Sequence, residues 1–178
     1  MSMILDVATI REPRQRIERT DEPSAFGQDE AFRIVAPVAL HAELRKDHEK
    51  VRLTGRLRTV LELECGRCLE GYALPVDTTF DLRYLPAAAM PSQPGEREVE
   101  EDDLDTAFYR DGLIDLAGLI REQLYLALPM KPLCRDDCRG LCAVCGTNFN
   151  TSSCSCANEW EDPRLAPLRA LTRDDDDA

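Results

Sequence analysis

Three successive stretches between residues 32 and 85 alternate between apolar and polar side chains. In the middle stretch the apolar side chains take odd positions, with charged or polar side chains between them: Val51, Leu53, Leu57, Leu61 and Leu63. The flanking stretches alternate on even positions, from Val38 to Leu44 and from Tyr72 to Tyr84. A period of two is typical of half-buried strands. We therefore predict an antiparallel β-meander over residues 32–85 with one covered face.

Two interruptions of the pattern suggest local features of this sheet. Lys46–Lys50 is a polar stretch of the length that a hairpin connection needs. Thr54 and Gly55 interrupt the middle stretch, which suggests a β-bulge.

The period changes after Asp111, where five apolar side chains follow helical spacing up to Pro129: Leu113, Leu116, Ile120, Leu124 and Leu128. This predicts a main helix over about residues 112–128, with Asp111 or Asp115 as its N-cap. Its apolar face is wide, so we expect it to pack on the sheet. The pair Asp162-Pro163 predicts the start of a short terminal helix, because proline suits the first helical position.

These elements predict an α+β fold, with an antiparallel β-meander sheet packed by one main helix. Six cysteines between residues 134 and 156 add a small C-terminal cysteine-rich zinc-binding module, because thiolates are ligands of structural zinc. The expected domains are a β-rich region (1–95), an acidic linker with the main helix (96–130), the zinc module with the terminal helix (131–173), and an acidic tail (174–178).

The net charge of −12 at pH 7 argues against a protein that coats nucleic acid electrostatically. The acids are concentrated, however: seven lie between Glu96 and Asp105, and four more are Asp174 to Asp177. The remaining charges are nearly balanced, so a local basic face is still possible. The acidic run itself is either a solvated loop or a dock for a basic protein.

No apolar stretch reaches the ~18–20 residues that a membrane span needs. The first ten residues lack the basic and apolar regions of a secretory signal, so we expect a cytoplasmic protein. In a reducing cytosol the eight cysteines would be thiols or metal ligands, not disulfides.

The strongest candidate metal ligands are Cys142, Cys145, Cys154 and Cys156. The spacing Cys142-x2-Cys145 lets both thiolates face one ion, and Gly146 permits the left-handed backbone of a tight turn. Residues 147–153 are long enough to bring the second pair back to the same ion. Thiolate ligands favour zinc.

The other four cysteines suggest a second site. Cys65 and Cys68 lie in a predicted turn between two strands, where Cys134 and Cys138 can meet them if the C-terminal module folds back. The alternative is that Cys65 and Cys68 pack as small apolar side chains or remain free thiols.

Two enzymatic hypotheses have little support. Cys138-x3-Cys142-x2-Cys145 matches the spacing of radical iron–sulfur enzymes, but these need a large downstream barrel and only 33 residues follow Cys145. Cys65-x2-Cys68 resembles a dithiol redox motif, yet it lies between strands and not at a helix N-terminus. The two histidines, His41 and His48, are expected on the surface, and no phosphate loop or hydrolase motif is present.

Four segments of the chain, three of which contain cysteines, resemble the YceD family, the large ribosomal RNA subunit accumulation proteins. The resemblance rests on Leu126–Cys134, Asp137–Asn150, Asp162–Leu168 and Cys65–Glu70, and covers about residues 30–172. Two small departures are Ala143, where proline is common, and Phe149, where leucine is usual. The resemblance implies a role in the synthesis, processing or stability of large-subunit rRNA, without catalytic residues.

A four-thiolate site has no open coordination position, so it suits a structural role and not hydrolysis. Four cations flank the cysteines and are our candidate contacts with rRNA or ribosomal proteins: Lys131, Arg135, Arg139 and Arg164. A solvated face around the metal is the alternative. The competing functions are a redox or iron–sulfur protein and a zinc-ribbon adaptor between proteins.

Overall fold

The computed structural model describes residues 3–89, 105–156 and 164. The chain divides into two compact units, which are described separately below. The sheet unit comprises residues 1–66 and 70–134, and the cysteine unit comprises residues 67–69 and 135–178.

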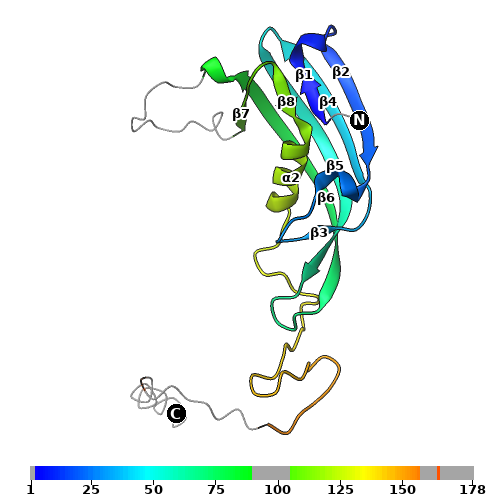
Figure 1. The fold of residues 1–178 in the computed structure, drawn as a ribbon, viewed down its shortest axis with the longest axis vertical. Helices are drawn as coiled ribbons and strands as arrows, with labels where there is room; N and C mark the ends of the chain where they lie inside the picture. Colours follow the sequence, from blue (N-terminus) through cyan, green and yellow to red (C-terminus); the bar gives the residue numbers. More distant parts are fainter. Residues whose placement is uncertain (1–2, 90–104, 157–163, 165–178) are drawn as a thin grey trace, which may run out of the picture. The chain divides into compact units, whose positions relative to one another are not determined.

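A six-stranded sheet forms most of the sheet unit, with the strand order β2-β4-β5-β6-β7 and β3 paired to β5 (Figure 1). Its strands are β2 (Arg14–Asp21), β3 (Arg33–Ile34), β4 (Val38–Asp47), β5 (Lys50–Glu64), β6 (Gly71–Pro86) and β7 (Thr106–Tyr109). The three predicted strands are β4, β5 and β6, and their antiparallel pairing is confirmed. β7 pairs parallel to β6, so the sheet is mixed and not purely antiparallel.

The connection between β4 and β5 is the short hairpin that the polar stretch predicted. Asp47 pairs with Lys50, and His48 takes the left-handed backbone conformation between them, with φ 55°. The predicted β-bulge at Thr54 and Gly55 is wrong, because β5 keeps one continuous register with both neighbours. Gly55 serves another purpose: a Cβ there would lie 2.7 Å from Cζ of Phe80, so glycine makes room for that ring.

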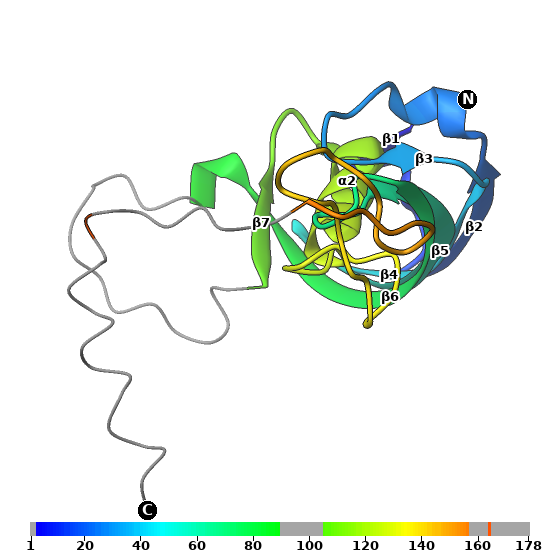
Figure 2. The same ribbon diagram turned by 90° about the horizontal axis from the view of Figure 1, so that it is seen from below.

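The main helix, α2 (Leu116–Leu126), lies against the covered face of the sheet. The sheet curves around this helix (Figure 2). Asp115, one of the two predicted N-caps, is the N-cap of α2. Its carboxylate accepts a hydrogen bond of 2.9 Å from the Ala117 amide. Among the described residues α2 is the only α-helix; the 3-10 turns are Val7–Thr9, Pro23–Phe26 and Ala87–Ala89.

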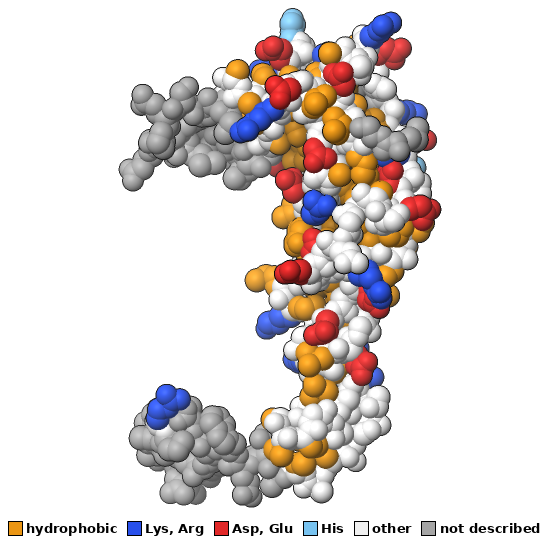
Figure 3. All heavy atoms as spheres, in the orientation of Figure 1, with side chains coloured by type: hydrophobic (Ala, Val, Ile, Leu, Met, Phe, Trp, Pro, Cys, Tyr) orange, Lys and Arg blue, Asp and Glu red, His pale blue; other side chains and the backbone are white. Residues whose placement is uncertain are grey.

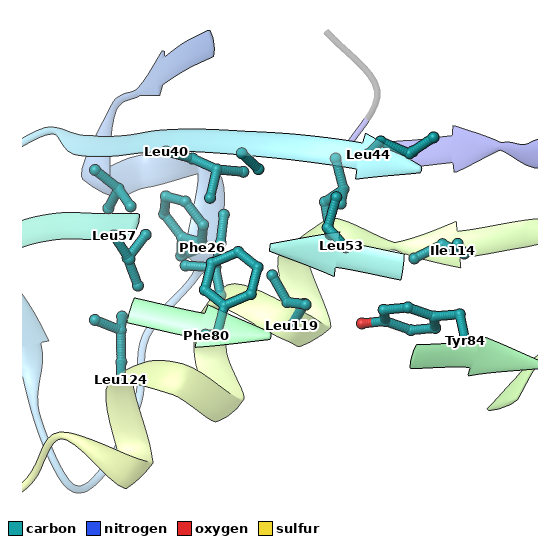
Figure 4. Packing of buried hydrophobic residues seen from close by; sticks show 14 of the residues in the cluster. Phe26, Leu40, Leu44, Leu53, Leu57, Phe80, Tyr84, Ile114, Leu119 and Leu124 are labelled. Atoms are coloured by element: carbon teal, nitrogen blue, oxygen red, sulfur yellow. The ribbon is translucent and has the colours of Figure 1, made fainter. Parts of the chain in front are cut away.

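Alternation along the strands directs apolar side chains into one core between the sheet and α2. Leu40, Leu53 and Leu57 are fully buried, and they face Leu119 and Leu124 of the helix (Figure 4). Burying such side chains contributes about 1.5–3 kcal/mol each, which makes this core the main source of stability for the sheet unit.

Strands near the N-terminus add to the predicted fold. β1 (Ile4–Asp6) pairs antiparallel with β8 (Leu113–Asp115) in a separate two-stranded sheet. The assignment of Leu113 to the helix is therefore wrong: it belongs to β8 and is 43% exposed. The helix begins at Leu116, since residues 113–115 pair with β1 instead.

Several predictions fall outside the described residues. These are most of the acidic run Glu96–Asp105, the terminal helix that begins near Asp162, and the acidic tail. The domain boundaries placed at these segments stay predictions.

Candidate metal centres

The segment around Cys142 and Cys145 forms a tight backbone turn within the cysteine unit. The Cys142 amide donates to the Thr147 carbonyl at 2.8 Å, and the Gly146 amide donates to the Cys142 carbonyl at 2.9 Å. The Phe149 amide closes the ribbon by donating to the Gly140 carbonyl at 2.9 Å. Gly146 has φ 72°, the left-handed conformation predicted for it. The turn therefore holds both cysteines on one short backbone scaffold.

This turn belongs to the second cysteine group, which we define as Cys142, Cys145, Cys154 and Cys156. The sulfur atoms of these residues all lie within 4.8 Å of one another. Zinc–sulfur bonds of about 2.3 Å in a tetrahedron place ligand sulfurs about 3.8 Å apart. The group can therefore hold a metal ion.

Hydrogen bonds to the sulfurs of Cys145 and Cys142 favour their thiolate forms, whereas the hydrogen bond with Cys145 raises the pKa of the Cys156 thiol to about 12. The Thr147 hydroxyl lies 3.1 Å from the Cys145 sulfur, and this hydrogen bond is the main cause that lowers the pKa of the Cys145 thiol to about 6. The Val144 amide donates to the Cys142 sulfur at 3.4 Å. The pKa of the Cys142 thiol is also lowered, chiefly by the backbone amide of Cys145 and then by that of Val144.

The first cysteine group consists of Cys65, Cys68, Cys134 and Cys138, whose sulfur atoms also lie within 4.8 Å of one another. Cys65 follows β5 directly, and its amide donates to the Glu70 carbonyl at 2.9 Å across the turn. Cys65, Cys68 and Cys138 are buried, with at most 3% of each exposed. This group too can hold a metal ion, and its chemistry is that of four soft ligands.

Polar groups adjoin the sulfurs of the first group. Burial, and then the nearby thiols Cys65 and Cys134, raise the pKa of the Tyr72 phenol. Among the described residues its hydroxyl is buried without a hydrogen-bond partner. The Asn150 amide nitrogen donates to the Cys138 sulfur at 3.3 Å. Hydrogen bonds of this kind stabilise metal-bound thiolates.

Asn150 is a residue that the sequence did not single out. Its side-chain oxygen accepts one hydrogen bond from the Arg135 guanidinium at 2.8 Å and another from the Arg139 amide at 2.9 Å. It thereby fixes both arginines beside Cys138. No local sequence signal marks this role, because the three residues meet only once the ribbon of residues 140–149 has formed.

The partition of the cysteines bears on the two enzymatic hypotheses. Cys138 belongs to the first group, whereas Cys142 and Cys145 belong to the second, so the three do not share one four-sulfur set. Cys65 and Cys68 lie in the connection between β5 and β6, and no helix begins there. The geometry that lowers a redox cysteine's pKa at a helix N-terminus is therefore missing from this described segment.

Comparison of the sequence with known proteins assigns the chain to a family. The family model described as "Large ribosomal RNA subunit accumulation protein YceD" matches residues 53–172. The chain belongs to the YceD family. The match includes all eight cysteines, so both groups lie within the part of the chain that defines the family.

Relatives of this YceD-family chain come from plants and bacteria. A chloroplastic YCED homolog 1 of Zea mays is 30% identical over 161 residues, which are 76% of this chain and 53% of the relative. An uncharacterized protein of Mycobacterium tuberculosis is 32% identical over 172 residues, 93% of this chain and 79% of the relative. The YceD protein of Haemophilus influenzae is 32% identical over 83 residues, 47% of this chain and 45% of the relative.

The chain spans about half the length of the first curated relatives that it matches. No solved structure matches it. The family name describes accumulation of large-subunit rRNA and names no reaction. None of the described helices is long and apolar enough to cross a bilayer.

The predicted contact residues of this YceD-family chain are all exposed in the structure: Lys131, Arg135, Arg139 and Arg164. Arg135 also pairs with Asp137 at 3.2 Å. The Arg139 guanidinium lies 6.0 Å from the centroid of the Phe149 ring, within the range of a cation–π contact. The structure thus brings Arg135 and Arg139 together at Asn150. Lys131 belongs to the sheet unit.

Proposed function

We propose that this protein is a ribosome biogenesis factor of the cytoplasm that supports the synthesis, processing or stability of large-subunit rRNA by binding and not by catalysis. Membership of the YceD family is the observation that carries the proposal. The described cysteine groups support it, because they suit structural metal ions and leave the surface for contacts with rRNA or ribosomal proteins.

Zinc is the metal that we propose for both groups. Each set of four thiols fits the tetrahedral coordination of a structural zinc ion, which carries no redox chemistry. A zinc ion bound by four thiolates has no position for water or substrate, so it holds backbone segments together. Cys142, Cys145, Cys154 and Cys156 would hold one ion, and Cys65, Cys68, Cys134 and Cys138 the other.

The first prediction tests the function in cells. Depletion of the protein should lower the amount of large-subunit rRNA relative to small-subunit rRNA, and the intact gene should restore the ratio. Ultraviolet crosslinking of the tagged protein should recover large-subunit rRNA, or a chemical crosslinker should recover ribosomal proteins. An unchanged rRNA ratio on depletion, with neither component recovered, would refute the proposal and favour an adaptor function outside the ribosome.

The second prediction concerns the cations of the cysteine unit. Replacing Arg135 and Arg139 by alanine should weaken rRNA or ribosome association by about tenfold or more, because each charge-assisted contact contributes about 1.5–3 kcal/mol. Metal content should be unchanged, since neither side chain is a thiol. Association is measured by co-sedimentation with ribosomal particles and metal by elemental analysis.

The matched control for this experiment is Arg11→Ala/Arg110→Ala, which removes the same charge from exposed positions of the sheet unit. It should associate like the unmodified protein. Equal association of both double variants would move the proposed contact to the acidic run Glu96–Asp105 and a basic ribosomal protein.

A further inference from the structure

Strand β2 forms one edge of the six-stranded sheet, since within the described part of the chain it pairs with β4 alone (Figure 1). It has 8 residues, whereas β7 at the other end of the strand order has 4. An edge strand presents a row of backbone N–H and C=O groups that no neighbouring strand satisfies. β2 is therefore the longer of these two edges at which a further strand can pair.

One hydrogen bond shows which backbone groups of β2 point away from the sheet. The Lys46 amide donates to the Pro13 carbonyl at 3.0 Å, and this continues the register of β2 against β4. Hydrogen-bonded and non-hydrogen-bonded pairs alternate in an antiparallel ladder, so the odd-numbered residues of β2 exchange hydrogen bonds with β4. The even-numbered residues direct their N–H and C=O groups outward: Arg14, Arg16, Glu18 and Thr20. Among the described residues these outward groups have no hydrogen-bond partner.

The side chains of β2 divide between the two faces of the sheet. Ile17 is half-buried and packs against the core, whereas the even-numbered side chains are exposed on the solvent face. Arg16 and Glu18 are neighbours on this face and carry opposite charges. Glu43, which lies opposite Arg16 on β4, forms its ion pairs with two other arginines. Within residues 3–89, 105–156 and 164, neither Arg16 nor Glu18 forms an ion pair.

We propose that two copies of this chain pair antiparallel through the outer edge of β2, about a twofold axis at Ile17. Residues equally distant from Ile17 then lie opposite each other, so Arg16 faces the partner's Glu18 and Arg14 faces the partner's Thr20. The outward backbone groups form four hydrogen-bonded pairs, which exchange about eight hydrogen bonds. The two Ile17 side chains meet at a non-hydrogen-bonded position, where side chains approach most closely. The pairing is independent of the proposed function.

Charge and backbone geometry together select this register. With the axis at Ile17, each Arg16 lies directly opposite a Glu18, which gives two favourable cross-strand pairs. An axis at Arg16 or at Glu18 would instead place two like charges opposite each other at the centre of the interface. A register shifted by one residue would oppose outward backbone groups to groups that are already bonded to β4, and it would mismatch the two faces.

A second copy fits this edge better than an arbitrary strand does. Charged side chains on an edge strand hinder indiscriminate pairing, so a partner strand must carry matching charges. The order Arg16-Ile17-Glu18 supplies this match to itself when it runs in the opposite direction. On the molecular face shown in Figure 3, acidic and basic side chains of the sheet unit are interspersed, which also suits a partner of the same composition. The twofold axis closes the assembly at two chains.

The third prediction concerns the mass of the protein in solution. Sedimentation velocity should give about twice the 20.0 kDa of one chain. Arg16→Glu places acids opposite each other at two sites of the dimer, and Glu18→Arg does the same with arginines. Each variant should therefore raise the dissociation constant of the dimer by about tenfold or more. Because both side chains are exposed, the circular dichroism spectrum should stay the same.

A mixture of the two single variants separates pairing through β2 from other effects of charge. An Arg16→Glu chain and a Glu18→Arg chain oppose an acid to an arginine at both sites, so they should form a heterodimer. The double variant Arg16→Glu/Glu18→Arg should dimerise for the same reason. The control Arg110→Glu makes the same charge change as Arg16→Glu at an exposed position outside β2. It should dimerise like the unmodified protein.

Four results would overturn the proposal. The first is an unmodified protein that remains monomeric at a chain concentration of about 100 μM. The second is a dimer of each single variant that is as stable as the unmodified one. The third is a mixture and a double variant that both remain monomeric. The fourth is a mass above two chains, because pairing about a single twofold axis closes at a dimer.

Discussion

Replacing Cys142 by serine should unfold the part of the cysteine unit that follows Cys138 and leave the sheet unit folded. Among the described residues of the cysteine unit, the buried apolar side chains are cysteines of the two groups, Cys68, Cys138 and Cys142. The residues of the hydrophobic core cluster all belong to the sheet unit. Under the proposal of bound zinc, the stability of the cysteine unit comes mainly from metal binding, which in zinc peptides amounts to roughly 10–16 kcal/mol.

Limited proteolysis and elemental analysis check this expectation together. Cleavage should begin after Cys138, because the first group, which includes Cys138, is expected to keep its ion. Under the proposal of one zinc per group, metal content should fall from two ions per chain to one, and the preparation should be colourless. Val144→Ser is the matched control, because Val144 is 61% exposed in the same turn and is not a thiol.

Three other results would contradict the expectation. Loss of the thermal transition of the sheet unit would mean that the two units do not fold separately. A brown protein that contains iron would replace the structural zinc proposal by the iron–sulfur alternative. Full protease resistance of Cys142→Ser would show that thiolate–metal bonds do not hold this unit.

The strands β4, β5 and β6 could be predicted from sequence, because apolar side chains alternate regularly along them. β2 lacks this alternation and could not be predicted. The inward positions of β4 and β5 are apolar apart from Lys46, Gly55 and Thr59. The inward positions of β2, by contrast, include Ile17, Arg19 and Asp21. Arg19 and Asp21 satisfy each other through an ion pair of 2.5 Å, so a charged strand can occupy the edge of the sheet. A pattern based on hydrophobicity carries no trace of that pairing.

Long-range pairing also explains the error at Leu113. Its spacing to Leu116 and Ile120 fits a helix, but residues 113–115 pair with Ile4–Asp6. Asp111 and Gly112, directly before β8, both have left-handed backbone conformations. They form a turn, and β8 begins after it. A strand partner that lies more than a hundred residues away in sequence cannot be inferred from local periodicity.

The cysteine motifs were visible in the sequence, but their surroundings were not. Spacing alone identified Cys142-x2-Cys145 and Cys65-x2-Cys68, because two thiols separated by a tight turn can face one ion. Cys138-x3-Cys142-x2-Cys145 also fits an iron–sulfur spacing, a hypothesis with little support from the sequence, and the structure places Cys138 in the first group. Which cysteines meet depends on how β5, β6 and residues 134–150 come together, and so does the role of Asn150.

Phe80→Ala should be the most damaging single substitution of the sheet unit that leaves all cysteines intact. Phe80 is 6% exposed, and its ring lies among Phe26, Leu57 and Leu119 (Figure 4). Its cross-strand neighbour is Gly55, which has no side chain to fill the space that the ring leaves. We expect a loss of about 3–5 kcal/mol in the free energy of unfolding, measured by chemical denaturation. Thr79→Ala on the solvent face should change it by less than about 0.5 kcal/mol.

A double-mutant cycle with Gly55→Ala tests the physical reason for this loss. A Cβ at residue 55 would lie 2.7 Å from Cζ of Phe80, 2.8 Å from the His41 carbonyl oxygen and 2.9 Å from Cβ of Ala42. Gly55→Ala alone should therefore destabilise the sheet unit by about 1–3 kcal/mol through overpacking. In the Phe80→Ala background the ring contact is gone and only the two contacts with β4 remain, so the same substitution should cost less. Strictly additive effects of the two substitutions would show that Gly55 and the Phe80 ring do not share this space.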